Sequence, residues 1–181
     1  MNRLIALSIA AALAAVPAAA NLPVGTKAPM FSTQAAKAGK AFGFNLRSAL
    51  AKGPVVLYFY PKAFTKGCTL EANAFAEATP EFSKYGATVV GLSNDDIETL
   101  KRFSKEECRD KFAVGTANAK IVQAYDADLV REGKSTGLTK RTSYVIDQKG
   151  RIVFVHSDLD YKDHVRLTMD AVKKLQANHK H

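Results

Sequence analysis

The sequence has few cysteines and no close cysteine pair. Only two occur in 181 residues, Cys68 and Cys108, and they lie 40 positions apart. The residue three before Cys68 is Thr65 and the residue three after it is Glu71, so the C-x-x-C motif of disulfide-exchange enzymes is absent. A copper chaperone would also need a close cysteine pair together with a histidine. These absences argue against disulfide exchange and against copper transfer.

The chain also lacks any block of like charge, although its formal net charge is +9. Lysine and arginine are spread along the sequence, and no aromatic-rich RNA-binding motif accompanies them. We therefore interpret the excess charge as a solvated basic surface and expect no nucleic-acid partner. Repeats and long linkers are missing as well, which predicts one domain over residues 21–181.

No hydrophobic run is long enough for a membrane anchor. The apolar stretch Leu4–Val16 is shorter than the roughly 20 residues that a spanning helix needs, and Pro17 follows it. A basic start at Arg3, an apolar centre and a small-residue end are the parts of a signal peptide. We predict a signal peptide over residues 1–20, export to the periplasm, and no stable membrane insertion after cleavage. No cysteine follows the run, which argues against a lipoprotein anchor.

Two cysteines in an exported protein invite a disulfide. On the chain-entropy account, a permanent bond between Cys68 and Cys108 would stabilise the fold by about 4 kcal/mol. A purely structural disulfide is therefore one open interpretation.

The position of Cys68 favours a second interpretation. The run Val55–Tyr60 is apolar, aromatic and β-branched, which is typical of a strand buried on both faces. Pro61 ends this strand because it has no N–H to donate. Lys66-Gly67 indicates a turn, and helix-compatible residues follow it. Cys68 thus lies at a predicted helix N-terminus, where unpaired N–H groups and the helix dipole stabilise a thiolate, so it is a candidate nucleophile.

The remaining pattern alternates strands with helices. We predict further strands at 41–46, 87–92, 112–114, 141–146 and 151–155, and helices at 68–79, 95–108 and 161–175. Residues 21–40 and 126–140 are expected to be loops. Pro80 is expected to end or kink the first helix, and a second helical piece to carry Phe82 and Tyr85. This order indicates an α/β fold with a mixed sheet. His156 and His164 are single histidines, expected at the surface or as caps rather than as metal ligands.

One family has this combination of motifs. The segment Tyr58-Phe59-Tyr60-Pro61-Lys62, with Thr65, Gly67-Cys68-Thr69 and Glu71, resembles the peroxiredoxins, and most of all their Q-type branch, the bacterioferritin-comigratory proteins. The stretch Arg141–Asp147 with Gly150 is similar to that family's arginine strand and the following turn. The resemblance covers nearly the whole chain after residue 20. It implies a thioredoxin-like fold, with a mixed central sheet flanked by helices and with N-terminal peroxiredoxin-type additions.

The resemblance also implies roles for particular residues. Cys68 would attack a peroxide as a thiolate and become a sulfenic acid. Arg141 would stabilise the thiolate and hold the peroxide oxygens, and the Thr65 hydroxyl would orient the peroxide. Pro61 would cover the sulfur and limit access of water. For Glu71 two roles stay open, favouring the helix dipole or holding Arg141 in place.

The resolving cysteine departs from the commonest Q-type pattern. Many members carry a second cysteine five residues after the first, and here that position is Asn73. Cys108 lies in or just after the helix that begins near Asp95, where some members place their resolving cysteine. The resemblance therefore implies a disulfide between Cys68 and Cys108 of one chain. Two cysteines in separate helices would need local unwinding, because a disulfide requires Cα atoms within about 7 Å.

These inferences give one leading function and two alternatives. The leading function is a thiol-dependent peroxidase, a peroxiredoxin that reduces hydrogen peroxide and organic hydroperoxides. Its electrons would come from thioredoxin or a periplasmic thioredoxin-like protein. We expect a monomer that uses neither a metal nor an organic cofactor. The alternatives are an exported thioredoxin-like module with a structural disulfide and no peroxidase activity, and a basic protein that binds anionic envelope surfaces.

Overall fold

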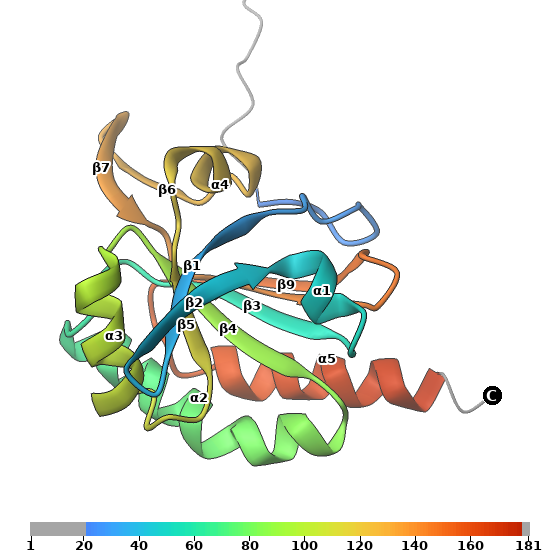
Figure 1. The fold of residues 1–181 in the computed structure, drawn as a ribbon. Helices are drawn as coiled ribbons and strands as arrows, with labels where there is room; N and C mark the ends of the chain where they lie inside the picture. The colour runs from blue at the N-terminus through green and yellow to red at the C-terminus, as the bar shows by residue number, and fades with distance from the viewer. Residues whose placement is uncertain (1–20, 179–181) are drawn as a thin grey trace, which may run out of the picture.

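The computed structural model describes residues 21–178, so the predicted signal peptide and the last three residues lie outside the described part. A seven-stranded sheet runs through the molecule (Figure 1). Its strands are β1 (Ser32–Lys37), β2 (Lys40–Asn45), β3 (Val55–Phe59), β4 (Thr88–Ser93), β5 (Ala113–Thr116), β8 (Thr142–Ile146) and β9 (Ile152–Ser157). Their order across the sheet is β2-β1-β5-β4-β3-β8-β9.

The sheet is of mixed direction. Strand β3 pairs in parallel with β4, and β4 with β5, whereas β8 is antiparallel to β3 and β1 is antiparallel to β5. Tyr58 in the middle of β3 lies between Gly91 of β4 and Ser143 of β8. A Cβ at Gly91 would lie 2.6 Å from the Tyr58 ring, so only glycine fits beside it. The predicted α/β fold with a mixed sheet is confirmed.

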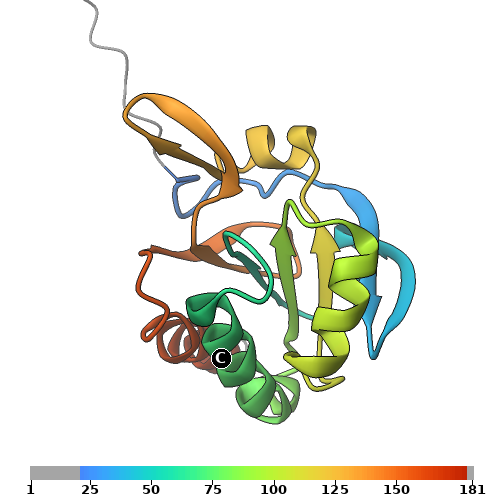
Figure 2. The same cartoon turned by 90° about the vertical axis from the view of Figure 1, so that its left-hand side faces the viewer.

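Helices cover both faces of the sheet (Figures 1 and 2). They are α1 (Leu46–Leu50), α2 (Lys66–Lys84), α3 (Ile97–Glu106), α4 (Ala119–Ala124) and α5 (His164–Asn178). Helices α2, α3 and α5 pack on the face that receives Val56 and Tyr58, and α1 and α4 on the face that receives Leu57 and Phe59. Because both faces are covered, β3 is apolar without alternation. Within residues 21–178, no helix is long and apolar enough to cross a bilayer.

Helix α2 is longer than predicted. It begins at Lys66 rather than Cys68, and it continues through Pro80 to Lys84, so the two helical pieces predicted on either side of the proline form one helix. Phe75 and Phe82, on either side of the proline, are both fully buried against the sheet. Their packing outweighs the missing hydrogen bond of a proline in a helix interior, which costs about 3 kcal/mol.

Two segments predicted as loops contain strands. Strand β1 lies within residues 21–40 and pairs with β2 around the turn Ala38-Gly39, where both residues have positive φ. Residues 126–140 contain the hairpin β6 (Asp128–Arg131) and β7 (Lys134–Thr139), which projects beyond the main sheet (Figure 2). Strands β1, β6 and β7 lack the regular apolar alternation by which a strand is recognised in sequence, whereas β2 coincides with the strand predicted at 41–46.

Candidate active site

Cys68 lies where the central strand passes into helix α2. Strand β3 ends at Phe59, and Cys68 is the third residue of α2, with a relative exposure of 2%. Thr65 occupies the N-cap position, but its side chain caps none of the N–H groups of the first turn. The predicted strand, loop and helix are present, and the thiol is at the helix N-terminus.

The loop that leads to Cys68 is anchored to other parts of the fold. The Thr139 hydroxyl, at the end of β7, donates to the Tyr60 carbonyl at 2.6 Å. The Ala63 N–H donates to Asp95 Oδ2, just after β4, at 2.7 Å. Between these anchors and the helix, Phe64 has a φ of 63°, in the left-handed region that side chains other than glycine rarely adopt. The anchors hold this unfavourable conformation in place.

The register of the sheet brings Arg141 to the same place. Strands β3 and β8 are antiparallel, and Phe59 at the end of β3 pairs with Thr142 at the start of β8. Arg141 directly precedes Thr142, so it lies at the same end of these two strands as the loop that leads from β3 to Cys68. Its side chain is 5% exposed.

Each of the three guanidinium nitrogens of Arg141 has one partner. Nη2 lies 3.5 Å from Cys68 Sγ, Nη1 donates to Glu71 Oε2, and Nε donates to the Leu159 carbonyl at 2.9 Å. A Cβ at Gly67 would lie 3.2 Å from Nη2, so glycine leaves room for the guanidinium beside the thiol. Three separate contacts fix its plane, which a single ion pair would not do.

The charge of the pair formed by Arg141 and Glu71 is set by burial. Glu71 has no exposed surface, and this burial raises the pKa of its carboxyl to about 8 against the opposing effect of Arg141. Burial acts to lower the pKa of Arg141, but Glu71 and Cys68 together raise it above its ordinary value. The guanidinium therefore keeps a positive charge beside the sulfur, which stabilises a thiolate. Two roles were predicted for Glu71, favouring the helix dipole or holding Arg141 in place. The structure contains the contact that the second role requires.

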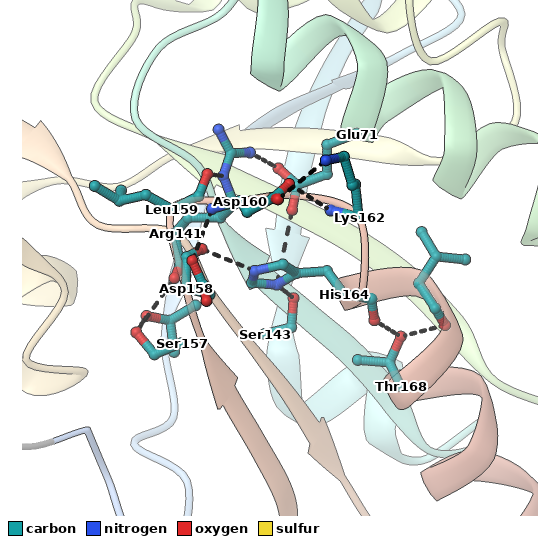
Figure 3. Close-up of polar contacts among 12 residues, drawn as sticks. Glu71, Arg141, Ser143, Ser157, Asp158, Leu159, Asp160, Lys162, His164 and Thr168 are labelled. Carbon is teal, nitrogen blue, oxygen red and sulfur yellow. Dashed lines mark hydrogen bonds and ion pairs between the residues drawn. The ribbon is translucent and has the colours of Figure 1, made fainter.

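His164 corrects the sequence prediction. It was expected at the surface or as a cap, yet it is fully buried at the start of α5. Figure 3 shows its ring between Ser143, Asp158 and Glu71. Nδ1 is 2.7 Å from Ser143 Oγ and Nε2 is 2.9 Å from the Asp158 carbonyl oxygen. Burial lowers the pKa of His164 to about 4, although the hydrogen bond with the Asp158 carbonyl opposes this.

Thr65 and Pro61 lie in the loop before Cys68, as predicted. The Thr65 side chain is exposed and its hydroxyl donates to the Lys62 carbonyl at 2.9 Å. Among residues 21–178, no hydrogen bond joins this hydroxyl to the thiol. Pro61 is half-buried. The structure thus brings Cys68, Arg141 and Glu71 into contact and places Thr65 three residues before the thiol, facing solvent.

Cys108 lies just after α3, next to the C-cap residue Glu107. It has no exposed surface and is a free thiol, as is Cys68. Burial raises the pKa of Cys108, and Glu107 adds to the effect. Two contacts from α2 hold the residues on either side of it: Asn73 Nδ2 donates to Glu107 Oε2 at 3.0 Å, and Arg109 Nη1 to Glu77 Oε1 at 3.1 Å. We call these two contacts the α2 clasp.

The fold and this geometry define a class of protein. A lone thiol at a helix start, placed against a guanidinium rather than a second thiol, is suited to redox chemistry by a single nucleophilic sulfur. Within the described residues, no three His, Cys, Asp or Glu side chains are grouped as metal ligands. The site therefore belongs to a thiol-based redox enzyme that differs from the C-x-x-C type.

Comparison with known proteins identifies the family. The sequence profile described as the AhpC/TSA family matches residues 24–155. Peroxiredoxin Bcp of Escherichia coli (strain K12) is 30% identical over 122 residues, which are 66% of this chain and 78% of that protein. A putative peroxiredoxin bcp of Coxiella burnetii is 31% identical over 147 residues, covering 80% and 95% of the two chains.

Solved structures agree. Peroxidoxin BcpB from Mycobacterium tuberculosis has a TM-score of 0.74 at 27% identity, covering 84% of this chain and 97% of that chain. Peroxiredoxin Q from Xanthomonas campestris has a TM-score of 0.69 at 25% identity, covering 79% and 90%. The chain belongs to the AhpC/TSA family, and its relatives include Bcp and Q peroxiredoxins. It is accordingly a thiol peroxidase, and the predicted thioredoxin-like fold is confirmed.

Proposed function

We propose that this enzyme reduces hydrogen peroxide and organic hydroperoxides through a sulfenic acid at Cys68, which Cys108 of the same chain then resolves as a disulfide. The observation that carries the proposal is the contact of Arg141 Nη2 with Cys68 Sγ at 3.5 Å, at the N-terminal turn of α2. A guanidinium in this place stabilises the thiolate and has donors that can also bind peroxide oxygens.

In the first step the Cys68 thiolate attacks one oxygen of the peroxide, ROOH. An S–O bond forms as the O–O bond breaks, so the sulfur is oxidised to sulfenic acid and the peroxide leaves as an alkoxide or hydroxide. The leaving oxygen takes a proton from solvent and departs as ROH or water. Arg141 stabilises the negative charge that passes from sulfur to oxygen. In this proposal Pro61 shields the sulfur, and the Thr65 hydroxyl orients the peroxide after turning from the Lys62 carbonyl.

In the second step the Cys108 thiol attacks the sulfenic acid, and a disulfide and one water molecule form. Both sulfurs are buried, Cys68 in the first turn of α2 and Cys108 just after α3, so the proposed disulfide requires local opening of that first turn and of the segment around Cys108. Arg109 and Asp110, which follow it, have φ values of 49° and 60°. Two successive residues in the left-handed region store conformational strain that rearrangement of this segment would release.

The electrons that return the disulfide to two thiols would come from thioredoxin or a thioredoxin-like protein. We propose that the enzyme is exported by a signal peptide over residues 1–20 and acts in the periplasm as a monomer. In that compartment the donor would be a periplasmic thioredoxin-like protein.

Mass spectrometry of both cysteines, after titration with one equivalent of peroxide, tests the proposal. We expect stoichiometric loss of peroxide and a disulfide between Cys68 and Cys108 in the wild type. Cys68→Ser should abolish both, Cys108→Ser should accumulate the sulfenic acid, and the surface control Lys120→Ala should behave as wild type. A Cys108→Ser enzyme that a dithiol recycles as fast as wild type would contradict resolution by Cys108. A peroxide-inert protein with a disulfide that resists mild reductants would instead favour a structural role.

A further inference from the structure

A groove of about 500 Å³ lies away from the thiol, at the other end of the parallel strands of the sheet. It is lined by Thr88 and Ala113, the first residues of β4 and β5, and it lies beside α1 (Figure 1). Cys68 instead follows the last residue of β3, which runs parallel to β4. The groove is therefore a site separate from the active site.

The groove is positively charged. Lys37, Lys52 and Lys111 line it, and none of its lining residues in the described chain is acidic. The three lysines are exposed and form no ion pair within residues 21–178. Carboxylates on a ligand would give these lysines partners, and such complementary charge selects one partner over another.

The groove also follows the free edge of β2. Four consecutive residues of this strand, 42–45, line it. Because successive side chains of a strand point to opposite faces, four neighbours line one groove only where that groove runs along the edge of the strand. In the described chain β2 is the outermost strand and pairs with β1 alone. Its outer N–H and C=O groups are therefore available to another extended chain.

The register of the hairpin identifies the groups that are free. Strands β1 and β2 are joined by a two-residue turn, so Lys37 and Lys40 on either side of it form a hydrogen-bonded pair. Such pairs alternate along an antiparallel ladder, so Phe42 and Phe44 also bond to β1. The residues that alternate with them direct their N–H and C=O away from β1. The Phe42 side chain is 43% exposed and offers an apolar contact.

We propose that this groove binds an extended acidic segment of another protein, which pairs with β2 as an added strand and places carboxylates against Lys37, Lys52 and Lys111. Main-chain pairing then supplies affinity, and the lysines and Phe42 supply selectivity. A nucleic acid or an anionic membrane matches the charge but has no peptide backbone to pair with the edge. Strand β2 of a second copy has Lys40 and no carboxylate, so it lacks the complementary charge.

The groove includes the segment that follows Cys108. Lys111 and Phe112 line it, and the Lys111 N–H donates to the Cys108 carbonyl at 2.9 Å. The disulfide proposed above requires this segment to open, so an occupant in contact with Lys111 favours the closed segment. At about ten times its Kd, such an occupant should slow disulfide formation about tenfold. This consequence rests on the proposed role of Cys108, whereas binding in the groove does not.

Binding of a synthetic peptide to the reduced protein tests the proposal. The probe has six residues, the length of β2, and alternates glutamate with valine. Fluorescence anisotropy should show saturable binding that weakens as salt is added. Lys37→Glu and Lys52→Glu should each weaken it about fivefold, whereas Lys120→Glu, exposed on α4 outside the groove, should not. Equal binding by Lys52→Glu and wild type would overturn the assignment of the groove.

A second peptide separates strand pairing from charge alone. Methylation of alternate backbone nitrogens removes donors but keeps every carboxylate, so affinity should fall about tenfold or more. Hydrogen exchange with the first peptide bound should slow at the outward N–H groups of β2 and not at Phe42 or Phe44. Equal affinity of the methylated peptide, or its equal displacement by polyphosphate or phosphatidylglycerol vesicles, would indicate a surface that reads charge only and overturn the proposal. A dimer that buries β2 without peptide would overturn it in favour of a second copy.

The rate of disulfide formation after one equivalent of peroxide tests the coupling to Cys108. Saturating probe peptide should slow this step about tenfold, and the methylated peptide at the same concentration should not. An unchanged rate with the probe bound would overturn the coupling. A protein that forms no disulfide in either sample would contradict resolution by Cys108 and this coupling with it, while the binding result would stand.

Discussion

Arg141 Nη2 and Cys68 Sγ lie 3.5 Å apart although 73 positions separate the two residues in sequence. The contact depends on the antiparallel register of β3 and β8, and on Gly67, which leaves room for the guanidinium. The two further contacts of Arg141, with Glu71 and with the Leu159 carbonyl, prevent it from turning away. The pairing of β3 with β8 therefore brings Arg141 to Cys68, and the contacts with Glu71 and Leu159 fix the orientation of the guanidinium.

Arg141→Lys should slow the reaction with peroxide by about 100-fold, the usual cost of removing one donor that stabilises developing charge. A lysine ammonium is a point charge that cannot contact Cys68, Glu71 and the Leu159 carbonyl at once. Stopped-flow measurement of peroxide consumption gives the rate constant. Arg166→Lys is the control, because Arg166 is exposed and pairs with Asp163 on the surface of α5. Equal rates for Arg141→Lys and wild type would contradict the role of Arg141.

Gly67→Ala should slow the same reaction by about 10-fold without loss of stability. The added Cβ would meet Arg141 Nη2 at 3.2 Å and displace the guanidinium by a few tenths of an ångström. Alanine is also the better helix former, by about 1 kcal/mol, so the melting temperature should not fall. Gly43→Ala is the matched control, since a Cβ there meets nothing within 4 Å. A slow Gly67→Ala enzyme that is also unstable would point to misfolding instead.

Loosening the α2 clasp should speed disulfide formation and leave the peroxide step unchanged. Asn73→Ala removes one contact that holds the residues next to Cys108, and Glu77→Gln removes the charge from the other. One such contact is worth about 1 kcal/mol or less at a partly exposed site, which predicts a two- to fivefold faster second step. Rapid quench and thiol alkylation after one equivalent of peroxide measure it.

Glu98→Gln is the control for the clasp. The pair of Glu98 with Lys101 lies in α3, the helix that precedes Cys108, but it does not contact the residues next to Cys108. It should form the disulfide at the wild-type rate. A slower second step in Asn73→Ala would mean that the clasp positions Cys108 for attack and does not restrain it.

The pH dependence of stability should separate Glu71 from His164. Burial raises the pKa of Glu71 from 4.5 to about 8, so its contribution is complete below pH 4.5 and is lost as the pH rises through 8. Burial lowers the pKa of His164 from 6.5 to about 4, so its contribution is complete above pH 6.5 and is lost as the pH falls through 4. Between pH 4.5 and 6.5 the two oppose each other.

Glu71→Gln removes the contribution of Glu71 and leaves that of His164. The free energy of unfolding of this variant should therefore fall more steeply on acidification than that of wild type. The His164 contribution alone amounts to about 3 kcal/mol at most between pH 6.5 and 4. Urea unfolding followed by circular dichroism at a series of pH values measures both slopes. Identical slopes for the two proteins would show that Glu71 is already ionised throughout this range.

The parts of the fold that were predictable from sequence are those specified by local pattern. Val55–Tyr60 has the apolar, aromatic and β-branched composition of a buried strand. Cys68 follows it at a position where the sequence predicts the N-terminus of a helix. Strands β1, β6 and β7 have no such pattern, because they are rich in polar and small residues and are defined by their pairing partners. Helix α2 continues past Pro80 because of tertiary packing, which a propensity rule does not contain.

The site divides in the same way. Cys68 and Arg141 could be assigned to the site from their motifs, but the buried residues His164 and Ser143 could not. His164 lies inside the helix predicted over 161–175, but its burial follows from the packing of α5 on the sheet, which a helical pattern alone does not specify. Ser143 carried a weak signal, as a polar residue within an apolar strand, since a buried hydroxyl needs a partner.

The anchored loop limits how much of the protein must lose order during the proposed cycle. Tyr60 and Ala63 are tied to groups outside α2, so opening the first helical turn leaves them in place. Freeing only the few residues around Cys68 gains little entropy, about 1–2 kcal/mol for each. The closed arrangement is then the resting state, and the open one is rare until oxidation. In the proposed cycle Cys68 is therefore ready to react with peroxide at all times, and it approaches Cys108 only after it has been oxidised.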